Sequence, residues 1–197
     1  VPSDDILNPE LLKQRIRQLG IGTMWLTSPL FNQLIRSDIE VFRGLNTLLV
    51  GGDVLSPTNI NRVRNRFKEL IVINGYGPTE NTTFSTTFTI EKDYDGSIPI
   101  GRPISNSTAY ICDTLGRPVP IGVVGELYVG GDGVANGYLN NPELTAERFL
   151  DTDEHRLEKR TDTDGFASRR GTMPRALATT SLYKTGDLAR WLSDGTI

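Results

Sequence analysis

The chain has 197 residues, enough for one domain of ordinary size or two small ones. Its 21 Lys and Arg residues against 24 Asp and Glu residues give a net charge of −3, so no basic excess points to a nucleic-acid partner. One cysteine, Cys112, and one histidine, His155, exclude an internal disulfide and argue against a zinc site, while no apolar run approaches the roughly 18 residues that span a membrane.

Helical and strand patterns alternate over the amino-terminal part of the chain. Asn8-Pro9-Glu10 indicates the start of a helix that ends at Gly20, with an apolar stripe made of Leu11, Leu12, Ile16 and Leu19. Further helices are expected to begin at Ser28-Pro29 and Ser56-Pro57, and strands are expected over 23–27, 45–50 and 70–73. The last helix carries cations that we expect on its solvated face: Arg62, Arg64, Arg66 and Lys68. The alternation predicts an α/β fold with a parallel, doubly wound, flavodoxin-like sheet.

Short apolar runs broken by Gly and Pro follow, which predicts a small distorted β-barrel. They cover 98–103, 108–112, 116–120 and 125–131, and a short helix is expected over 139–149. Cys112 is interpreted as a small apolar residue of one such strand in a cytoplasmic protein. We divide the chain into an α/β subdomain (1–92), a β-rich subdomain (93–150), a polar inserted loop (151–181) and the start of a closing motif (182–197). Its abrupt ends suggest a fragment.

A loop rich in functional side chains follows the strand over 70–73. Tyr76 suits stacking on a base, Thr79 suits a phosphate oxygen, and Glu80 suits a hard cation such as magnesium. The glycines at 51–52 and at 75–77 are expected at one edge of the sheet, where they would share a crevice. A tight turn with an incidental acid is the other interpretation of this loop. Asp187 follows a strand, and it is either a turn residue or a carboxylate for both ribose hydroxyls.

Three motifs occur in the order and approximate spacing of adenylation domains of nonribosomal peptide synthetases. They are Asn74-Gly75-Tyr76-Gly77-Pro78-Thr79-Glu80, Gly125-Glu126-Leu127-Tyr128-Val129-Gly130-Gly131 through Gly137-Tyr138, and Tyr183-Lys184-Thr185-Gly186-Asp187-Leu188-Ala189-Arg190. The chain resembles this family over nearly its whole length except the loop after Phe149. The family belongs to the AMP-forming ligases, so the resemblance implies that ATP and an amino acid react to an aminoacyl adenylate and pyrophosphate.

The resemblance also implies roles for individual residues. Thr79 and Glu80 would act in catalysis, with Glu80 as the magnesium ligand. ATP or AMP would contact Gly52, Asn74, Gly75, Tyr76, Gly77, Thr79 and Asp187, with Tyr76 on adenine and Asp187 on the ribose. The amino-acid pocket would be lined by Trp25, Leu49, Gly51, Gly75, Thr83 and Phe84. Two aromatics beside glycines fit a small branched side chain, so valine is the expected substrate, although composition alone places Trp25 in the core.

The implied partners are a carrier domain, whose phosphopantetheine thiol takes the aminoacyl group, and a condensation domain. The family's phosphate loop and the aspartate that pairs with the substrate amine would precede residue 1, and the hinge and the lid with its catalytic lysine would follow Ile197. We therefore expect the isolated chain to be inactive or nearly so. The stretch between Phe149 and Tyr183 is longer than in the family, and an inserted loop and a sequence error are both open.

Two other classes of function are open. An acyl-CoA synthetase or a luciferase-like ligase would keep the nucleotide residues and change the pocket. A non-catalytic remnant would keep the fold without binding nucleotide. No nucleic-acid partner and no membrane partner is expected for the chain.

Overall fold

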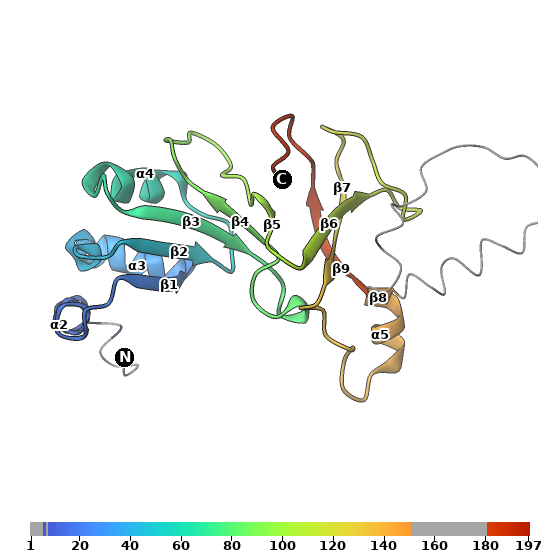
Figure 1. Cartoon of the computed structure of the whole chain (residues 1–197), viewed down its shortest axis with the longest axis horizontal. Coiled ribbons are helices and arrows are strands. Elements are labelled where there is room, and N and C mark those ends of the chain that lie inside the picture. The colour runs from blue at the N-terminus through green and yellow to red at the C-terminus, as the bar shows by residue number, and fades with distance from the viewer. Residues whose placement is uncertain (1–5, 7, 151–180) are drawn as a thin grey trace, which may run out of the picture. The chain divides into compact units, whose positions relative to one another are not determined.

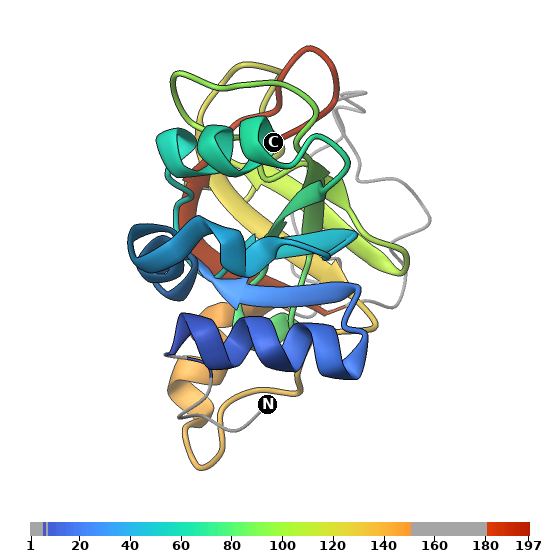
Figure 2. The same ribbon diagram turned by 90° about the vertical axis from the view of Figure 1, so that its left-hand side faces the viewer.

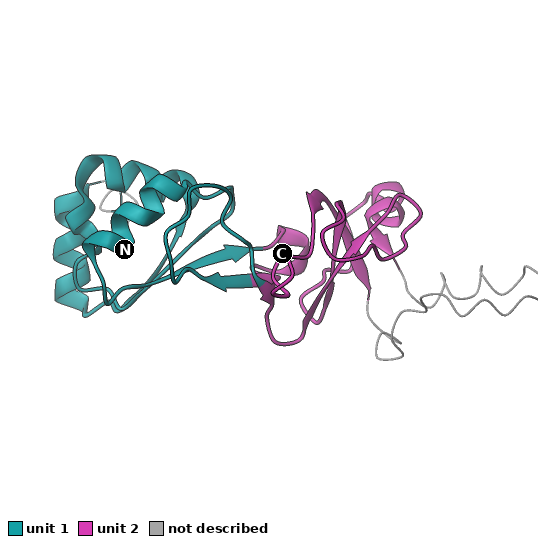
Figure 3. Cartoon of the chain, turned by 90° about the horizontal axis from the view of Figure 1, so that it is seen from above, with its two compact units in different colours: residues 1–76, 87–101 teal, residues 77–86, 102–197 magenta. Residues whose placement is uncertain are grey.

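A computed structural model describes residues 6, 8–150 and 181–197. The chain forms two compact units, one of Val1–Tyr76 with Thr87–Gly101 and one of Gly77–Thr86 with Arg102–Ile197 (Figure 3). Segment 77–86 therefore packs with the second unit, although the strand before it belongs to the first. The functional boundary expected near residue 92 stays a prediction. The polar loop expected over 151–181, with His155, lies outside the described residues except for Ser181.

The first unit is an α/β layer with parallel strands, as predicted (Figure 1). Its elements are α2 (Pro9–Leu19), β1 (Thr23–Thr27), α3 (Ser28–Asp38), η1 (Ile39–Phe42), β2 (Thr47–Gly51), α4 (Pro57–Arg66) and β3 (Ile71–Tyr76), and β4 (Thr86–Thr89) follows β3 in the sheet. Strand β2 pairs in parallel with β1 on one side and with β3 on the other. This arrangement sets the carboxyl ends of these three strands side by side.

Local capping explains where the helices begin and end. The Asn8 side chain accepts hydrogen bonds from the backbone N–H of Glu10 and Leu11 at 3.1 and 3.3 Å, and Gly20 ends α2 in the left-handed conformation with φ 61°. The predicted apolar stripe of α2 was too wide. Leu11 and Leu19 are exposed, because α2 packs mainly against α3 and η1 and buries the narrower row of Leu12 and Ile16.

The core of the first unit lies on one face of the parallel strands. Strand residues that alternate along β1, β2 and β3 supply one side of it, and residues of α3 and α4 supply the other. Figure 2 shows the ribbons of these helices and strands. The strand side consists of Leu26, Leu48, Val50 and Val72, and the helix side includes Phe31, Leu34, Ile35, Ile60 and Val63. The intervening strand residues Trp25, Leu49 and Ile73 point to the other face and are less buried.

Arg64 of α4 is not part of a solvated face, contrary to the prediction. Its Nη1 lies 2.6 Å from Asp93 Oδ1, its Nε donates to the Ile90 carbonyl at 2.8 Å, and its side chain is 18% exposed. The helix period placed this residue correctly, but the return of the chain after β4 covers it. Arg64 therefore ties α4 to the segment that follows β4.

Replacing Arg64 by alanine is expected to lower the free energy of unfolding by about 1.5–3 kcal/mol, because charged hydrogen bonds of a partly buried group are lost. Arg62→Ala is the matched control, since Arg62 lies on the same helix and is exposed, and it should change stability by less than about 0.5 kcal/mol. Urea unfolding of both variants measures the difference. Equal effects would show that the Arg64 contacts contribute nothing.

The second unit contains a curled antiparallel sheet of half-barrel form, in agreement with the predicted β-rich subdomain. Its elements are η2 (Thr79–Asn81), β5 (Arg102–Pro103), β6 (Ser107–Cys112), β7 (Gly125–Gly131), α5 (Pro142–Arg148), β8 (Phe149–Leu150) and β9 (Leu182–Ala189), and the sheet order is β6-β7-β9-β8. One predicted strand is shorter than expected and one is wrong. The run 98–103 keeps β5, which follows β4 in the sheet, and the run 116–120 makes a single bridge between Pro118 and Cys112, since prolines remove ladder donors.

Cys112 is buried at the end of β6 next to Tyr128 and Leu182, which confirms its interpretation as a small apolar residue. Burial, with the nearby charges of Asp113 and Glu126, raises the pKa of the Cys112 thiol to about 11. Among the described helices, none has both the length and the apolar character needed to cross a membrane.

The Cys112 thiol is expected to resist a thiol reagent at pH 8 in the folded chain and to react rapidly in urea, because the thiolate is the reactive form. Since its folded pKa lies above the unfolded value, the unfolded state loses this proton first. Stability should fall as the pH rises from about 9 toward 11 and be unaffected by this group below that range. Reaction kinetics in buffer and in urea measure the first effect, and rapid labelling of the folded chain would contradict it.

Candidate functional site

The carboxyl ends of β1, β2 and β3 bring two predicted glycine positions together. Thr27, Gly51 and Gly75 are register partners across the three strands. This confirms that the loops after β2 and β3 leave neighbouring strands at one edge of the sheet, where open α/β sheets bind ligands.

Four of the six predicted pocket residues share one face of this sheet. Trp25 is the register partner of Leu49, Gly51 lies two residues beyond Leu49, and Gly75 is the partner of Gly51. Residues two apart on a strand point to the same side, so these four positions form one patch. Trp25 is 50% exposed, so its assignment to the core by composition is wrong.

The structure explains why position 51 is a glycine, which the sequence did not reveal. A Cβ atom at this position would lie 2.0 Å from the Gly75 carbonyl oxygen, so a side chain would push β2 away from β3. Gly75 is buried as well. The patch is therefore bare backbone at its carboxyl end, and the bulk at its other end comes from Trp25.

Other predicted site residues of the first unit are placed as follows. Asn74 is buried, and its amide nitrogen donates to the Pro99 carbonyl at 2.9 Å. Gly52 follows β2 with φ 77° and is exposed, and Tyr76 is half buried at the end of β3. Their roles toward a nucleotide stay predictions.

The loop of residues 77–85 is packed against itself in the second unit. A Cβ on Gly77 would lie 2.6 Å from the Ser85 backbone nitrogen and 2.7 Å from the Thr83 carbonyl oxygen. The Asn81 amide donates to Ser85 Oγ at 2.7 Å, inside the loop. A glycine at 77 is thus required by the loop's own folding, and the loop forms a self-packed platform.

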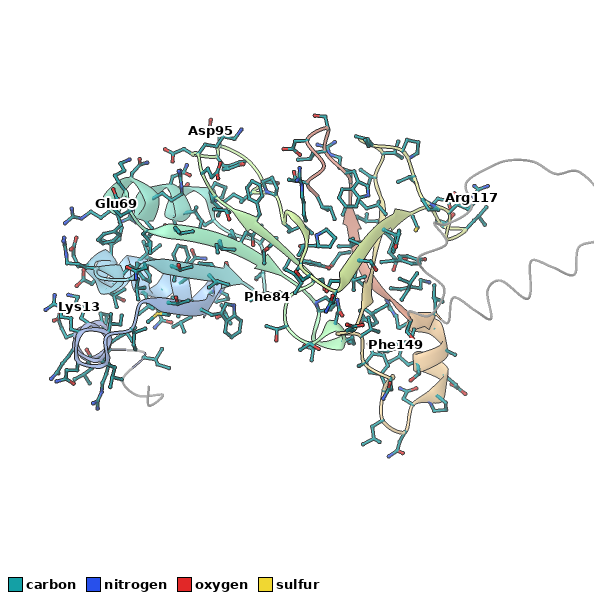
Figure 4. All side chains as sticks on the ribbon, viewed as in Figure 1. Lys13, Glu69, Phe84, Asp95, Arg117 and Phe149 are labelled. Carbon is teal, nitrogen blue, oxygen red and sulfur yellow. The ribbon has the colours of Figure 1, made fainter. Side chains whose placement is uncertain are left out.

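Two further hydrogen bonds fasten this loop to the segment after β7. The Ala135 N–H donates to the Glu80 carbonyl at 2.8 Å, and Thr82 Oγ1 donates to the Gly133 carbonyl at 2.8 Å. Thr79 and Thr83 are exposed, and Phe84, which is labelled in Figure 4, is half buried. The loop therefore presents Thr79 to solvent while its backbone is held.

Glu80 is the single acid of this loop, and its carboxylate accepts a short hydrogen bond. The Tyr138 hydroxyl donates to Glu80 Oε1 at 2.6 Å, and the Tyr183 hydroxyl oxygen lies 3.1 Å from that of Tyr138. Partial burial raises the pKa of the Glu80 carboxyl, but hydrogen bonds from Tyr138, from the Glu80 backbone and from Tyr183, together with the charge of Arg148, outweigh burial and hold its pKa below the usual value. Glu80 is therefore a carboxylate at neutral pH.

The two tyrosines were not recognised as site residues from the sequence. The hydrogen bond to Glu80 raises the pKa of the Tyr138 phenol, and burial raises that of Tyr183, so both keep their protons and act as donors. Each belongs to a motif quoted above, Gly137-Tyr138 and Tyr183-Lys184. That was the only available signal, because neither residue is near Glu80 in the sequence.

Asp187 lies in a bulge of β9, where a turn was expected. The register with β7 passes from Tyr128 opposite Lys184 to Glu126 opposite Leu188, so three residues of β9 face one of β7. Thr185 Oγ1 donates to the Leu127 carbonyl at 2.8 Å, and the Gly186 N–H donates to Glu126 Oε1 at 3.1 Å. The bulge, with Gly186 at φ 81°, is stabilised by these bonds and presents Asp187 on the surface.

The donor set fits a magnesium ion that is shared with a phosphate ligand. Within the described residues no group of three or more His, Cys, Asp or Glu side chains could hold a metal ion by itself. Mg²⁺ commonly uses one or two carboxylates together with substrate phosphates and water, and the ionised Glu80 offers one.

Comparison with known proteins decides the family. The profile of the family described as AMP-binding enzyme matches residues 1–139. The chain belongs to this family. The resemblance stated from the three motifs is confirmed.

Its relatives include large bacterial synthetases. The chain is 52% identical to tyrocidine synthase 3 of Brevibacillus parabrevis over 100% of the chain and 3% of that protein. It is 50% identical to gramicidin S synthase 2 of Brevibacillus brevis over 100% of the chain and 4% of that protein. The chain thus spans only a small part of the curated relatives that it matches.

Solved structures agree in fold. PA1221, a nonribosomal peptide synthetase protein with adenylation and PCP domains bound to a vinylsulfonamide inhibitor, matches with a TM-score of 0.79 at 33% identity, over 95% of this chain and 30% of its own. The amino-terminal subdomain of Klebsiella oxytoca NpsA with 3-hydroxybenzoyl-AMSN has a TM-score of 0.77 at 24% identity, over 95% of this chain and 41% of its own. The α/β sheet and the half-barrel are therefore those of the amino-terminal part of an adenylation domain.

Proposed function

We propose that the chain is part of an adenylation domain that activates an amino acid with ATP. A carboxylate oxygen of the amino acid attacks the α-phosphorus, the bond to the β-phosphate oxygen breaks, and pyrophosphate leaves with both electrons of that bond. The products are an aminoacyl adenylate and pyrophosphate. The observation that supports this reaction most directly is the fastened loop 77–85 with its ionised Glu80, in a chain of the AMP-binding enzyme family.

The residues of this chain position the reactants and neutralise charge. No protein nucleophile is required, so catalysis rests on placement and on electrostatic stabilisation. In this proposal Tyr76 stacks on adenine and Thr79 contacts the phosphates, while Asn74 and the glycines Gly52, Gly75 and Gly77 shape the nucleotide site. Asp187, presented by the bulge of β9, accepts hydrogen bonds from the ribose hydroxyls.

Glu80 would hold magnesium, which supplies positive charge to the phosphates and the leaving pyrophosphate when bound. The carboxylate is ionised and one of its oxygens, Oε1, is already oriented by Tyr138. Thr79 precedes Glu80 in the same platform, is exposed, and would offer its hydroxyl to the phosphates.

The amino-acid side chain would lie on the patch of Trp25, Leu49, Gly51 and Gly75, and the resemblance to the family assigns Thr83 and Phe84 to the same substrate. The observation that supports a small aliphatic substrate is the shared face of the first four residues, bulky at Trp25 and bare at the glycines. Valine is the proposed substrate. An apolar pocket separates side chains that differ by one methylene by only about 1–3 kcal/mol, so isoleucine or leucine should also react slowly.

The aminoacyl group would then pass to the phosphopantetheine thiol of a carrier domain, for use by a condensation domain. The adenylation and PCP domains joined in PA1221 are consistent with such a partner. We also propose that the 197 residues alone are inactive or nearly so, since the resemblance to the family implies that the phosphate loop and the lid lysine lie outside them.

Pyrophosphate exchange tests this proposal. The chain is placed in a complete adenylation domain, and exchange is measured with valine, isoleucine, leucine, phenylalanine and a fatty acid. We expect the highest kcat/KM with valine. Exchange that depends on the fatty acid would favour an acyl-CoA synthetase or luciferase-like ligase, and a folded domain without exchange or ATP binding would favour a non-catalytic remnant.

A further inference from the structure

We propose that Tyr138, supported by Tyr183, is a positioning residue that sets how strongly Glu80 holds the divalent cation on the ATP phosphates. This inference rests on the proposed function and adds two residues to which no role was assigned. It follows from the chain of contacts Glu80, Tyr138 and Tyr183, whose oxygen atoms are separated by 2.6 and 3.1 Å.

Tyr138 has little freedom of its own. Its backbone N–H donates to Thr145 Oγ1 at 2.9 Å, and its ring meets the Phe149 ring edge-on with centroids 5.4 Å apart. Phe149 in turn packs on Tyr183, with centroids 5.0 Å apart. Figure 4 marks Phe149 at the end of α5. The three rings therefore hold the two phenols in place before any ligand binds.

The backbone directly before Tyr138 also lies close to α5. Gly137 has φ 137°, and a Cβ there would lie 2.4 Å from Thr145 Cγ2. The chain thus turns tightly against α5 directly before Tyr138. This contact and the hydrogen bond to Thr145 direct the phenol toward Glu80.

The hydrogen-bond partner of the Glu80 carboxylate is a phenol. A phenol donates a short hydrogen bond without adding positive charge, so Glu80 keeps its full negative charge for a cation. A guanidinium hydrogen-bonded in the same place would neutralise that charge, whereas the charge of Arg148 is the smallest of the effects that lower the Glu80 pKa. Orienting one carboxylate oxygen also removes part of the side-chain entropy that metal binding would otherwise cost.

A purely structural role is the competing explanation, and the structure separates the two. The loop is also fastened by the Ala135 to Glu80 and Thr82 to Gly133 hydrogen bonds, which do not involve the phenol. Tyr138→Phe keeps the ring that packs on Phe149 and removes only the hydroxyl. The variant should therefore fold, and its effect should appear in cation binding.

Calorimetry of ATP binding, with Mg²⁺ and with EDTA, tests the proposal in a complete adenylation domain that contains this chain. For the parent domain we expect tighter binding with Mg²⁺. Tyr138→Phe should reduce this enhancement by about tenfold and leave the affinity in EDTA unchanged, as for the loss of a group that orients a metal ligand. Tyr183→Phe should reduce it by a smaller factor. Tyr110→Phe, a half-buried tyrosine of β6 in the same sheet, is the matched control and should change neither value.

The outcomes are distinct. An unchanged enhancement in Tyr138→Phe, whether or not its melting temperature falls, would overturn the positioning role. A stronger enhancement would show that the phenol competes with the cation for the carboxylate, and it would also overturn the proposal. A folded parent domain that binds no ATP in either buffer would reject the proposed function itself and the inference with it, whereas ATP binding with an unaffected Tyr138→Phe would reject only the inference.

Discussion

Glu80→Gln in a complete adenylation domain is expected to reduce pyrophosphate exchange by about 10²–10³-fold, because a metal that neutralises phosphate charge supplies several kcal/mol in the transition state. The substitution keeps the length of the side chain and an oxygen that can accept the Tyr138 hydrogen bond, so it removes the charge alone. The measurement is kcat and KM for exchange over a range of free Mg²⁺ concentrations. We expect the Mg²⁺ concentration at half-maximal rate to rise as kcat falls.

Glu143→Gln is the control for this variant, since Glu143 is an exposed acid in the first turn of α5 in the same unit. It should exchange at the parent rate. A Glu80→Gln domain that is folded, as judged by its melting curve, and exchanges within about threefold of the parent would remove Glu80 from the metal site, and the alternative of an incidental acid in a turn would regain support.

Asp187→Ala is expected to weaken ATP binding by about 10²-fold. The carboxylate would accept two hydrogen bonds from the ribose, and each bond to a charged group contributes about 1.5 kcal/mol, or about tenfold. Comparison of ATP with 2′,3′-dideoxy-ATP makes this test specific. The parent domain should bind ATP about 10²-fold more tightly than the dideoxy compound, and the variant should bind both equally.

Asp95→Ala serves as the control, since Asp95 is an exposed aspartate of the first unit. It should keep the parent preference for ATP. If Asp187→Ala binds ATP weakly but still prefers it over the dideoxy compound, the aspartate supports the bulge of β9 and the ribose hydroxyls are recognised elsewhere.

Much of the first unit could be predicted because its signals are local. Asn8 caps α2 through bonds to residues two and three positions away, and Gly20 ends that helix through its own backbone conformation. The prediction of which helix residues are buried was wrong in part. The period of a helix shows which residues share a face, but Leu11 and Leu19 are exposed and Arg64 is covered because of elements that pack there from elsewhere in the chain.

The second unit was harder to predict, because short strands depend on their neighbours. The run 116–120 had the composition of a strand, but it finds only a single bridge partner. The stretch from Tyr183 to Asp187 looked like a strand that ends at Gly186, whereas pairing with β7 carries β9 through a bulge to Ala189. A glycine in a strand can mark the end of the strand or a bulge within it, and pairing with the partner strand decides which of the two forms.

Local sequence was sufficient for the α/β pattern, the helix caps, the loop with Glu80 and the membership in the AMP-binding enzyme family. The folded chain was needed to show why Gly51 and Gly77 must be glycines, which face Trp25 occupies, and that two phenols hold Glu80. The reason is distance along the polypeptide. Caps and periodicity arise among residues within one or two turns, whereas Tyr138 is 58 residues from Glu80 and Gly133 is 51 residues from Thr82, so only the three-dimensional packing brings them into contact.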